Sequence, residues 1–182
     1  MARACDLRHP LMRSATVPPV TGKPRVELTP KAVELWRTTD AADFLRAWTT
    51  GEVDQGAHAA YVGNLLTEVP APGRVVMTWT PTPGLTNLTG GVHGGYVALV
   101  CDEACGLASA STGERFIPML TLDLDLTYLR PALVGQVHRV EGTVLHKGRA
   151  RIVAEARVLT PEGKLAASAR GSFLPNQQFD PT

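Results

Sequence analysis

Apolar and polar side chains alternate one by one along residues 117–129. Leucines occupy every second position in the centre of this segment, and threonines and aspartates fill the positions between them. Such alternation is typical of a β-strand that turns one face to a core. It predicts one face with Leu120, Leu122, Leu124 and Leu126, and an opposite face with Thr121, Asp123, Asp125 and Thr127.

Further strands are predicted before and after this segment. Two apolar runs at 61–69 and 74–80 are joined by the turn Pro-Ala-Pro-Gly. Short connections of this kind join neighbouring antiparallel strands, so the last strands of the chain are expected to form an antiparallel meander. After the alternating segment, turns with Gly or Pro separate three more strand-like runs, at 134–146, 149–159 and 164–173.

The most apolar helix is predicted at 93–110. It contains no Lys or Arg, and its only formal charges are Asp102 and Glu103. A surface helix normally carries a polar stripe with several charges, so this helix is expected to be covered on most sides. On a helical wheel, one side carries Val97, Val100, Cys101, Ala104, Leu107 and Ala108, and the side of Asp102 carries Gly95, Ala98, Cys105, Gly106 and Ser109.

This wheel predicts how the helix is used. The apolar side would pack on the chain's own sheet, and the side with small residues and Asp102 would face a substrate or a partner subunit. Cys101 and Cys105 are expected to be small apolar core residues. A single long helix cannot cover both faces of a parallel sheet, so we predict an α+β fold with an antiparallel sheet wrapped on this helix.

The chain of 182 residues is expected to hold one main domain, because domains cluster at roughly 100–200 residues. We assign this domain to 57–176, with a flexible N-terminal arm at 1–28, a helical extension at 29–56 and a C-terminal tail at 177–182.

The helical extension has clear start and break signals. Thr29 is a plausible cap and Pro30 suits the first helical position, while a break is expected near 38–40. Trp36, Phe44 and Trp48 supply apolar side chains, so the extension is expected to pack near the substrate pocket as a lid or brace.

Charge and cysteine usage narrow the function classes. Eighteen Lys and Arg residues against 17 Asp and Glu residues give a formal charge of +1, so nucleic acid and membrane surfaces are not expected partners. The three cysteines do not suggest a disulfide framework or a metal site. The N-terminus lacks the apolar run of a secretory signal, and we expect a cytoplasmic protein.

Glycines surround the predicted start of the central helix, in the run Gly-Gly-Val-His-Gly-Gly at 90–95. The first N–H groups of a helix have no partner within it and lie at the positive end of its dipole, which suits a developing negative charge. Asp102 follows His93 by nine residues, about 13 Å along the helix axis. One helix cannot direct both groups to one small atom, so either two subunits share a site or Asp102 has another role.

At these residues the sequence resembles the hotdog-fold acyl-CoA thioesterases, in the branch of phenylacetyl-CoA and 4-hydroxybenzoyl-CoA thioesterases. The similarity spans about 59–174. It implies a hotdog fold, in which an antiparallel sheet wraps a long helix, and a homodimer or a homotetramer (a dimer of hotdog dimers) with active sites shared between subunits. The matching features are Asn87, His93-Gly94-Gly95, Asp102, and the strand end Tyr128-Leu129-Arg130-Pro131.

The resemblance also implies residue roles. Asp102 would activate water or attack the thioester, and the Gly94 N–H would polarise the thioester carbonyl. Asn87 and His93 would orient the carbonyl, the water or the turn, and Thr121 would help to hold water. A purely structural role stays open for these last three residues. Asn87 would then be a loop residue, His93 a turn-stabilising side chain and Thr121 an ordinary strand threonine.

Coenzyme A is expected as part of an acyl-CoA substrate, with no separate cofactor and no metal. Because coenzyme A carries phosphates, we expect a local patch of basic residues to bind it. An equal alternative is that the candidate residues are solvated charges in turns. The candidate residues for binding coenzyme A are Gly95, Arg130, Lys147, Gly148 and Arg149.

Three alternatives remain beside the thioesterase with Asp102 as its acid. Glu103, one helical step away, is the rival acid. A non-catalytic module on the same fold would bind acyl-CoA or acyl-carrier thioesters, and a hotdog hydratase would use a different arrangement of acid and histidine. The spacing around Asp102 favours the thioesterase, and aromatic, short-chain and medium-chain acyl groups are all compatible with it.

Overall fold

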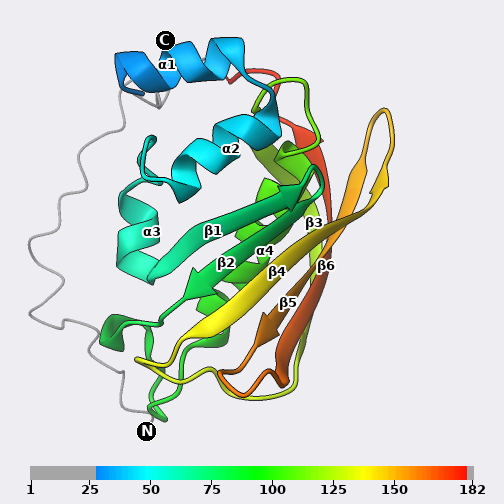
Figure 1. Ribbon diagram of the computed structural model, residues 1–182. Coiled ribbons are helices and arrows are strands. Elements are labelled where there is room, and N and C mark those ends of the chain that lie inside the picture. Colours follow the sequence, from blue (N-terminus) through cyan, green and yellow to red (C-terminus); the bar gives the residue numbers. More distant parts are fainter. Residues whose placement is uncertain (1–27, 180–182) are drawn as a thin grey trace, which may run out of the picture.

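Figure 1 shows the protein as a computed structural model, in which residues 28–179 are described. The predicted arm at 1–28 lies outside the described residues, apart from Leu28, and so do the last residues of the predicted tail. Three helices come first: α1 (Pro30–Thr38), α2 (Ala41–Thr49) and α3 (Ala57–Val62). They are followed by β1 (Asn64–Ala71), β2 (Arg74–Trp79), the short 3-10 helix η2 (Pro83–Leu85), α4 (Gly94–Ala110), β3 (Met119–Tyr128), β4 (His138–Lys147), β5 (Ile152–Leu159) and β6 (Leu165–Pro175).

The strands form one antiparallel sheet in the order β1-β2-β4-β5-β6-β3. The long helix α4 contacts the five strands from β2 to β3, and Figure 1 shows the sheet curving around it. The helices α1, α2 and α3 lie on the side of β1. The predicted α+β fold, with an antiparallel sheet wrapped on a central helix, is confirmed.

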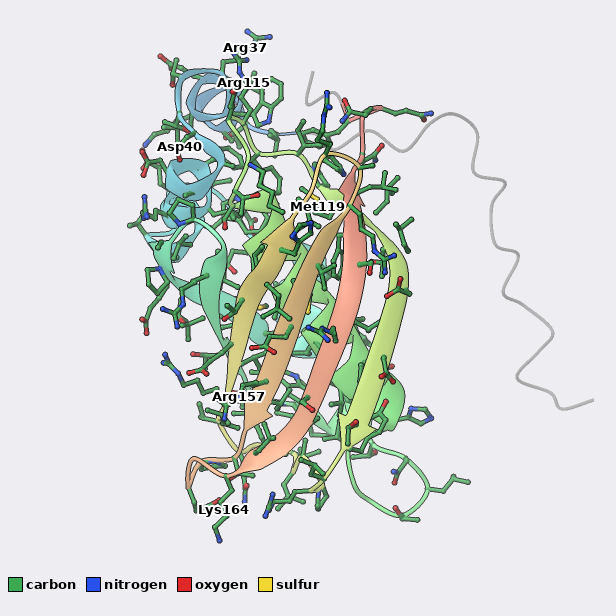
Figure 2. The ribbon with its side chains drawn as sticks, turned by 90° about the vertical axis from the view of Figure 1, so that its right-hand side faces the viewer. Arg37, Asp40, Arg115, Met119, Arg157 and Lys164 are labelled. Atoms are coloured by element: carbon green, nitrogen blue, oxygen red, sulfur yellow. The ribbon has the colours of Figure 1, made fainter. Side chains whose placement is uncertain are left out.

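The strand order differs from the predicted meander in the position of β3. The strands β4, β5 and β6 are successive neighbours, as expected, but β3 pairs with β6 and not with β4. The connection between β3 and β4, at 129–137, is too long for a tight hairpin and contains Pro131, so the chain crosses to an inner position of the sheet. Strand β3 therefore forms an edge of the sheet, beside β6 in Figure 2.

Because β3 contains a β-bulge, its side-chain pattern differs from the alternation predicted for 117–129. The pairing of β3 with β6 shifts between Thr121 and Asp123, which leaves Leu122 without an opposite residue. Thr121 pairs with the buried Phe173, on the face toward α4. Strict alternation predicts Thr121 on the face of Asp123, and that prediction is wrong because the extra residue reverses the alternation.

The predicted strand at 61–69 begins too early. Residues Ala57–Val62 form helix α3, and β1 starts at Asn64. Three alanines favour a helix in this segment, and Gly63 ends it in the left-handed conformation with φ 79°. A Cβ at Gly63 would lie 2.2 Å from the carbonyl oxygen of Thr80, so glycine is required where α3 meets the end of β2.

The helical extension begins and breaks where the sequence predicts. The Thr29 hydroxyl accepts a hydrogen bond from Ala32 N at 3.3 Å, and Pro30 is the first residue of α1. The chain leaves the helix after Thr38, and the Asp40 carboxylate then caps α2. Both caps satisfy N–H groups that have no partner inside their helices.

Helix α4 is buried more completely than its wheel predicts. The predicted apolar side is covered, but Cys105 and Ser109, which the wheel places beside Asp102, are buried too, because the curved sheet reaches around the helix. Burial raises the pKa of the Cys101 thiol to about 12, and the charge of Asp102 adds to this rise. Cys101 and Cys105 are free thiols in the core, as predicted. Within residues 28–179, no helix has both the length and the apolar character that a membrane crossing needs.

A buried histidine, His138, lies where the end of β2 pairs with the start of β4. The ring of His138 lies 5.6 Å from the ring of Trp79, and its Nδ1 donates to Gln136 O at 2.9 Å. Its Nε2 is buried and has no hydrogen-bond partner among the described residues. Burial lowers the pKa of His138 below its ordinary value, and hydrogen bonds to the backbone offset only part of this effect.

This histidine is expected to make folding sensitive to acid. Because its pKa is lower in the folded state, the unfolded chain binds the proton first, and stability is lost as the pH falls through the ordinary histidine range. The pH slope of the unfolding free energy from His138 is at most about 1.4 kcal/mol per pH unit. Denaturant melts between about pH 7.5 and 5.5 should show a shallower slope for His138→Asn than for wild type. His146→Asn, at an exposed position, is the control and should keep the wild-type slope; equal slopes for all three proteins would contradict this role.

Candidate active site

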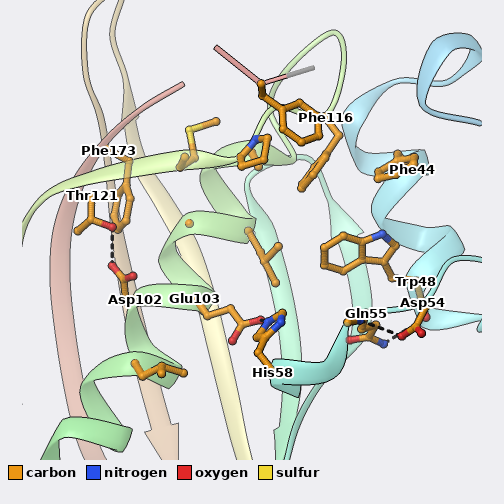
Figure 3. A pocket seen from close by; sticks show the side chains of 18 of the residues that line it. Phe44, Trp48, Asp54, Gln55, His58, Asp102, Glu103, Phe116, Thr121 and Phe173 are labelled. Atoms are coloured by element: carbon orange, nitrogen blue, oxygen red, sulfur yellow. Dashed lines mark hydrogen bonds and ion pairs between the residues drawn. The ribbon is translucent and has the colours of Figure 1, made fainter. Parts of the chain in front are cut away.

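Asp102 lies half-buried on α4, with its carboxylate directed toward the bulged strand β3 (Figure 3). Its Oδ1 accepts a hydrogen bond from the Thr121 hydroxyl at 2.8 Å. The bulge at Leu122 turns Thr121 toward the helix, so the contact depends on the irregularity in the strand. The structure thus brings together two of the predicted catalytic residues.

A cavity of about 520 Å³ opens beside this pair. Its volume lies within the range of small-molecule sites. Asp102 and Thr121 lie at one side of it, and Figure 3 shows Phe44, Trp48 and Phe116 across from them. Most of its wall is apolar, with side chains from α2, α4, β3 and β6 and from the segment after α4, and the polar lining residues are Asp54, Gln55, His58, Asp102, Glu103 and Thr121.

Glu103, the rival acid, also lines the cavity but is held by two neighbours. Its Oε1 lies 3.1 Å from His58 Nε2, and its Oε2 accepts a hydrogen bond from the buried amide of Asn64. Both carboxylate oxygens are therefore engaged by side chains of the same chain. His58 is not among the residues predicted from the sequence, because its partner lies 45 residues away along the chain and no local motif connects them.

The start of α4 forms a second group of predicted residues. His93 is the N-cap of the helix, and its Nδ1 accepts a hydrogen bond from Gly95 N at 3.0 Å. The Tyr128 hydroxyl donates to Gly94 O at 2.9 Å and so fixes the first turn. The Gly94 N–H makes no hydrogen bond among the described residues and stays available as a donor. The sequence motif at 128–131 contains Tyr128 but does not indicate its contact with Gly94.

Asn87 shapes the loop before the helix. Its side-chain Oδ1 accepts hydrogen bonds from the backbone N and the hydroxyl of Thr89, at 2.9 and 2.7 Å. Its backbone N donates to Gly91 O at 2.8 Å, which closes the loop. Within one chain, Asn87 and His93 therefore make the local contacts of a loop residue and a cap.

These two groups are too far apart to act on one atom. Asp102 follows Gly94 by eight residues on a continuous helix, which is about 12 Å along its axis. The cavity is lined by Asp102 but not by Gly94, His93 or Asn87. A single chain therefore holds the acid and the helix-start donor in separate places.

The predicted residues for binding coenzyme A are also separated. The Arg130 guanidinium donates to Leu165 O, and the Lys147 ammonium to Thr112 O, each at 2.6 Å. Arg130 follows the end of β3 that pairs with Ala167, whereas Lys147 lies in the same row of the sheet as Phe173. This separation amounts to about 20 Å along the strands, so one chain does not assemble the predicted basic patch.

Comparisons with known proteins agree with this architecture. A family model described as the thioesterase superfamily matches residues 89–167, which run from the loop before α4 into β6. A putative esterase of Saccharolobus solfataricus is 33% identical over 101 residues, which cover 56% of this chain and 71% of the relative. The chain belongs to the thioesterase superfamily. The predicted hotdog fold and the predicted enzyme class, a thioester hydrolase, are thereby confirmed.

Two further similarities bear on the ligand of this thioesterase. Human acyl-coenzyme A thioesterase 13 is 29% identical over 110 residues, covering 60% of this chain and 78% of the human protein. A solved structure described as a hypothetical thioesterase with coenzyme A, from Streptococcus pneumoniae, superposes with a TM-score of 0.58 and 26% identity. That alignment covers 64% of this chain and 91% of the other.

Gln55 braces the wall of the cavity. Its Nε2 donates to Trp48 O at 3.2 Å and to Leu66 O at 3.0 Å, and its Oε1 accepts from Leu66 N at 2.7 Å. One side chain thus joins the end of α2 to strand β1. These hydrogen bonds fix the backbone of Trp48 relative to the sheet.

Removing this brace is expected to loosen the extension. Gln55→Ala leaves buried backbone groups of Leu66 without partners, which costs about 1–3 kcal/mol of unfolding free energy. Thermal or urea unfolding measures the loss, with Gln178→Ala, at an exposed position, as the matched control. Unchanged stability of Gln55→Ala would show that the bridge contributes nothing.

Proposed function

We propose that this thioesterase hydrolyses acyl-CoA esters to a free acid and coenzyme A, at a site that two copies of the chain share. The observation that carries the proposal is the half-buried carboxylate of Asp102, held by Thr121 at the edge of a largely apolar cavity. The names of the human relative and of the CoA-containing streptococcal structure support coenzyme A as the thiol part of the substrate.

In this proposal Asp102 supplies the base or the nucleophile. Its Oδ1 is held by Thr121, and its Oδ2 makes no hydrogen bond among the described residues, so Oδ2 is free to take a proton from water or to attack the carbonyl carbon. A thiolate is a good leaving group, so the reaction needs little help from a general acid.

The Gly94 N–H of the second copy would polarise the thioester carbonyl. The donor lies at the first turn of α4, where the helix dipole favours negative charge. An N–H group placed at the developing oxyanion contributes about 10²–10³ to the rate of acyl transfer. Asn87 and His93 would serve this step by fixing the loop and the cap that orient the donor.

A homodimer built through β3 would bring acid and donor together. This edge strand has unpaired backbone groups on one side, and large apolar side chains are exposed along it and just after it. Antiparallel pairing of β3 with its copy reverses the second α4, so the start of one helix lies near the middle of the other. A tetramer of two such dimers is compatible with this pairing, and no resident cofactor is needed. The exposed apolar residues are Leu120, Leu122, Tyr128 and Leu129.

The first test is the acid itself. Asp102→Asn keeps the size of the side chain and the bond to Thr121 but removes the base, so kcat is expected to fall by about 10²–10⁴. Release of free thiol from acyl-CoA measures turnover, and calorimetric titration with acyl-CoA should show that binding remains. Asp125→Asn, on the opposite face of β3, is the control with wild-type turnover. A fully active Asp102→Asn variant would contradict the proposal; a wild type that binds acyl-CoA without releasing thiol would indicate a binding module.

The second test separates one-chain and two-chain sites. Gly94→Pro removes the N–H without backbone strain, because proline suits the first helical position and His93 already has the extended backbone that precedes proline. Its Cβ would lie 3.4 Å from the Tyr128 side chain, an ordinary contact that Gly94→Ala also makes. Its kcat should fall by about 10²–10³, whereas Gly94→Ala, which keeps the N–H, should stay active.

Mixing the two inactive variants extends this test. A heterodimer of Asp102→Asn with Gly94→Pro contains one site with both Asp102 and the Gly94 N–H intact. Unfolding and refolding the variants together should therefore restore thiol release, while refolding each alone should not. No recovery in a mixture that contains heterodimers would place the acid and the donor in the same chain.

A further inference from the structure

Three of the four aromatic residues at the far wall of the cavity come from parts of the chain outside the segment that matches the family model. Phe44 and Trp48 come from α2, and Phe179 comes from the tail after β6, whereas the match covers 89–167. Phe116 completes this group from the segment after α4. We call these four residues the aromatic wall. The matched segment therefore provides the acid and Phe116, and segments outside it provide the other three residues of the wall.

The aromatic wall is packed as a fixed unit. The ring of Phe116 lies 5.2 Å from the ring of Phe44 and 5.5 Å from the ring of Trp48. Phe179 contacts Phe116 edge to face at 6.3 Å, and Trp36 Nε1 donates to Phe116 O at 2.6 Å. Aromatic pairs at such distances add to the energy of burial. Helix α2 is thus anchored to the core around Phe116, and it limits the cavity as a wall rather than as a loose lid.

The charged side chains that line the cavity are acidic, and the one basic side chain among the lining residues is His58. Asp54, Asp102 and Glu103 line the cavity, and none of its described lining residues is Lys or Arg. His58 is engaged with Glu103, so it offers no separate cation to a ligand. A carboxylate on the acyl group would meet acidic groups without a basic partner, which is unfavourable where water is displaced.

We propose that the helical extension selects the acyl group: it restricts the enzyme to uncharged, apolar acyl groups of limited length, and Trp48 sets that length. This inference rests on the proposed function. With the thioester carbonyl at Asp102, the acyl chain enters the cavity and ends at the aromatic wall, across from the acid (Figure 3). Trp48 is the specificity-determining residue because its indole faces the cavity and Gln55 fixes its backbone.

The decisive experiment compares acyl-CoA esters from butyryl-CoA to palmitoyl-CoA by thiol release. Trp48→Ala shortens the wall, so the ratio of kcat/KM for long over short esters should rise roughly 10-fold or more. Trp48→Phe keeps an aromatic ring and should give a smaller shift. Thr29→Ala removes the cap of α1 but no lining residue, and it should keep the wild-type ratio even where stability falls.

The outcomes separate this inference from the function on which it rests. A wild type that hydrolyses none of the esters would overturn the proposed function. A wild type that hydrolyses them, with the same chain-length profile in folded Trp48→Ala, would overturn only the role of the extension. Circular dichroism establishes that each variant is folded.

Two substrates of equal length test the selection of uncharged acyl groups. Butyryl-CoA and succinyl-CoA have the same number of acyl carbons, and only the second carries a carboxylate at the far end. The wild-type kcat/KM should be at least about 10-fold higher for butyryl-CoA, in line with the cost of an unpaired buried charge. Equal values, or a preference for succinyl-CoA, would contradict selection of uncharged acyl groups.

Discussion

The separation of two groups on one rigid helix governs the rest of this account. Asp102 and the Gly94 N–H belong to α4, and the rise of a helix keeps them about 12 Å apart in every chain. The sheet covers most of the helix, and the half-buried acid lines the cavity. A carbonyl group that needs both must therefore receive them from two copies of the helix, and the exposed edge strand β3 offers the surface that can join these copies.

The additions to the superfamily core have a different task from the core itself. The core supplies the acid, the threonine that holds it and the helix start. The extension supplies Phe44 and Trp48 of the aromatic wall. His58, in α3, is engaged with Glu103, whereas Asp102 keeps one carboxylate oxygen without a hydrogen bond among the described residues. In the proposed mechanism, the chemistry comes from α4 and β3, and the choice of acyl group comes largely from the extension.

Much of the fold follows from local patterns, and the failures have identifiable physical causes. The burial of α4 follows from its lack of charge, and the start of α1 follows from Thr29 and Pro30. The bulge at Leu122 follows from pairing with β6, and nothing in the leucine alternation indicates it. That bulge directs Thr121 to Asp102, so the local pattern misplaced a side chain of the candidate site.

Local sequence patterns likewise do not predict contacts between segments that are distant along the chain. The position of β3 at the sheet edge depends on its pairing with β6, and the bond from His58 to Glu103 links α3 to α4. Asp102 and Gly94 could be named from the sequence because glycines at a helix start and an acid in an uncharged helix are local signals. The aromatic character of the extension was readable, whereas Phe116 and Phe179 join the wall only through tertiary packing.

The shared site is tested most directly by measuring specific activity and mass together over a dilution series. Sedimentation gives the fraction of chains in dimers at each concentration, and thiol release gives the turnover per chain in the same samples. If two chains share each site, turnover falls in proportion to the dimer fraction and vanishes in the monomer. A folded monomer with the turnover of the dimer would contradict it.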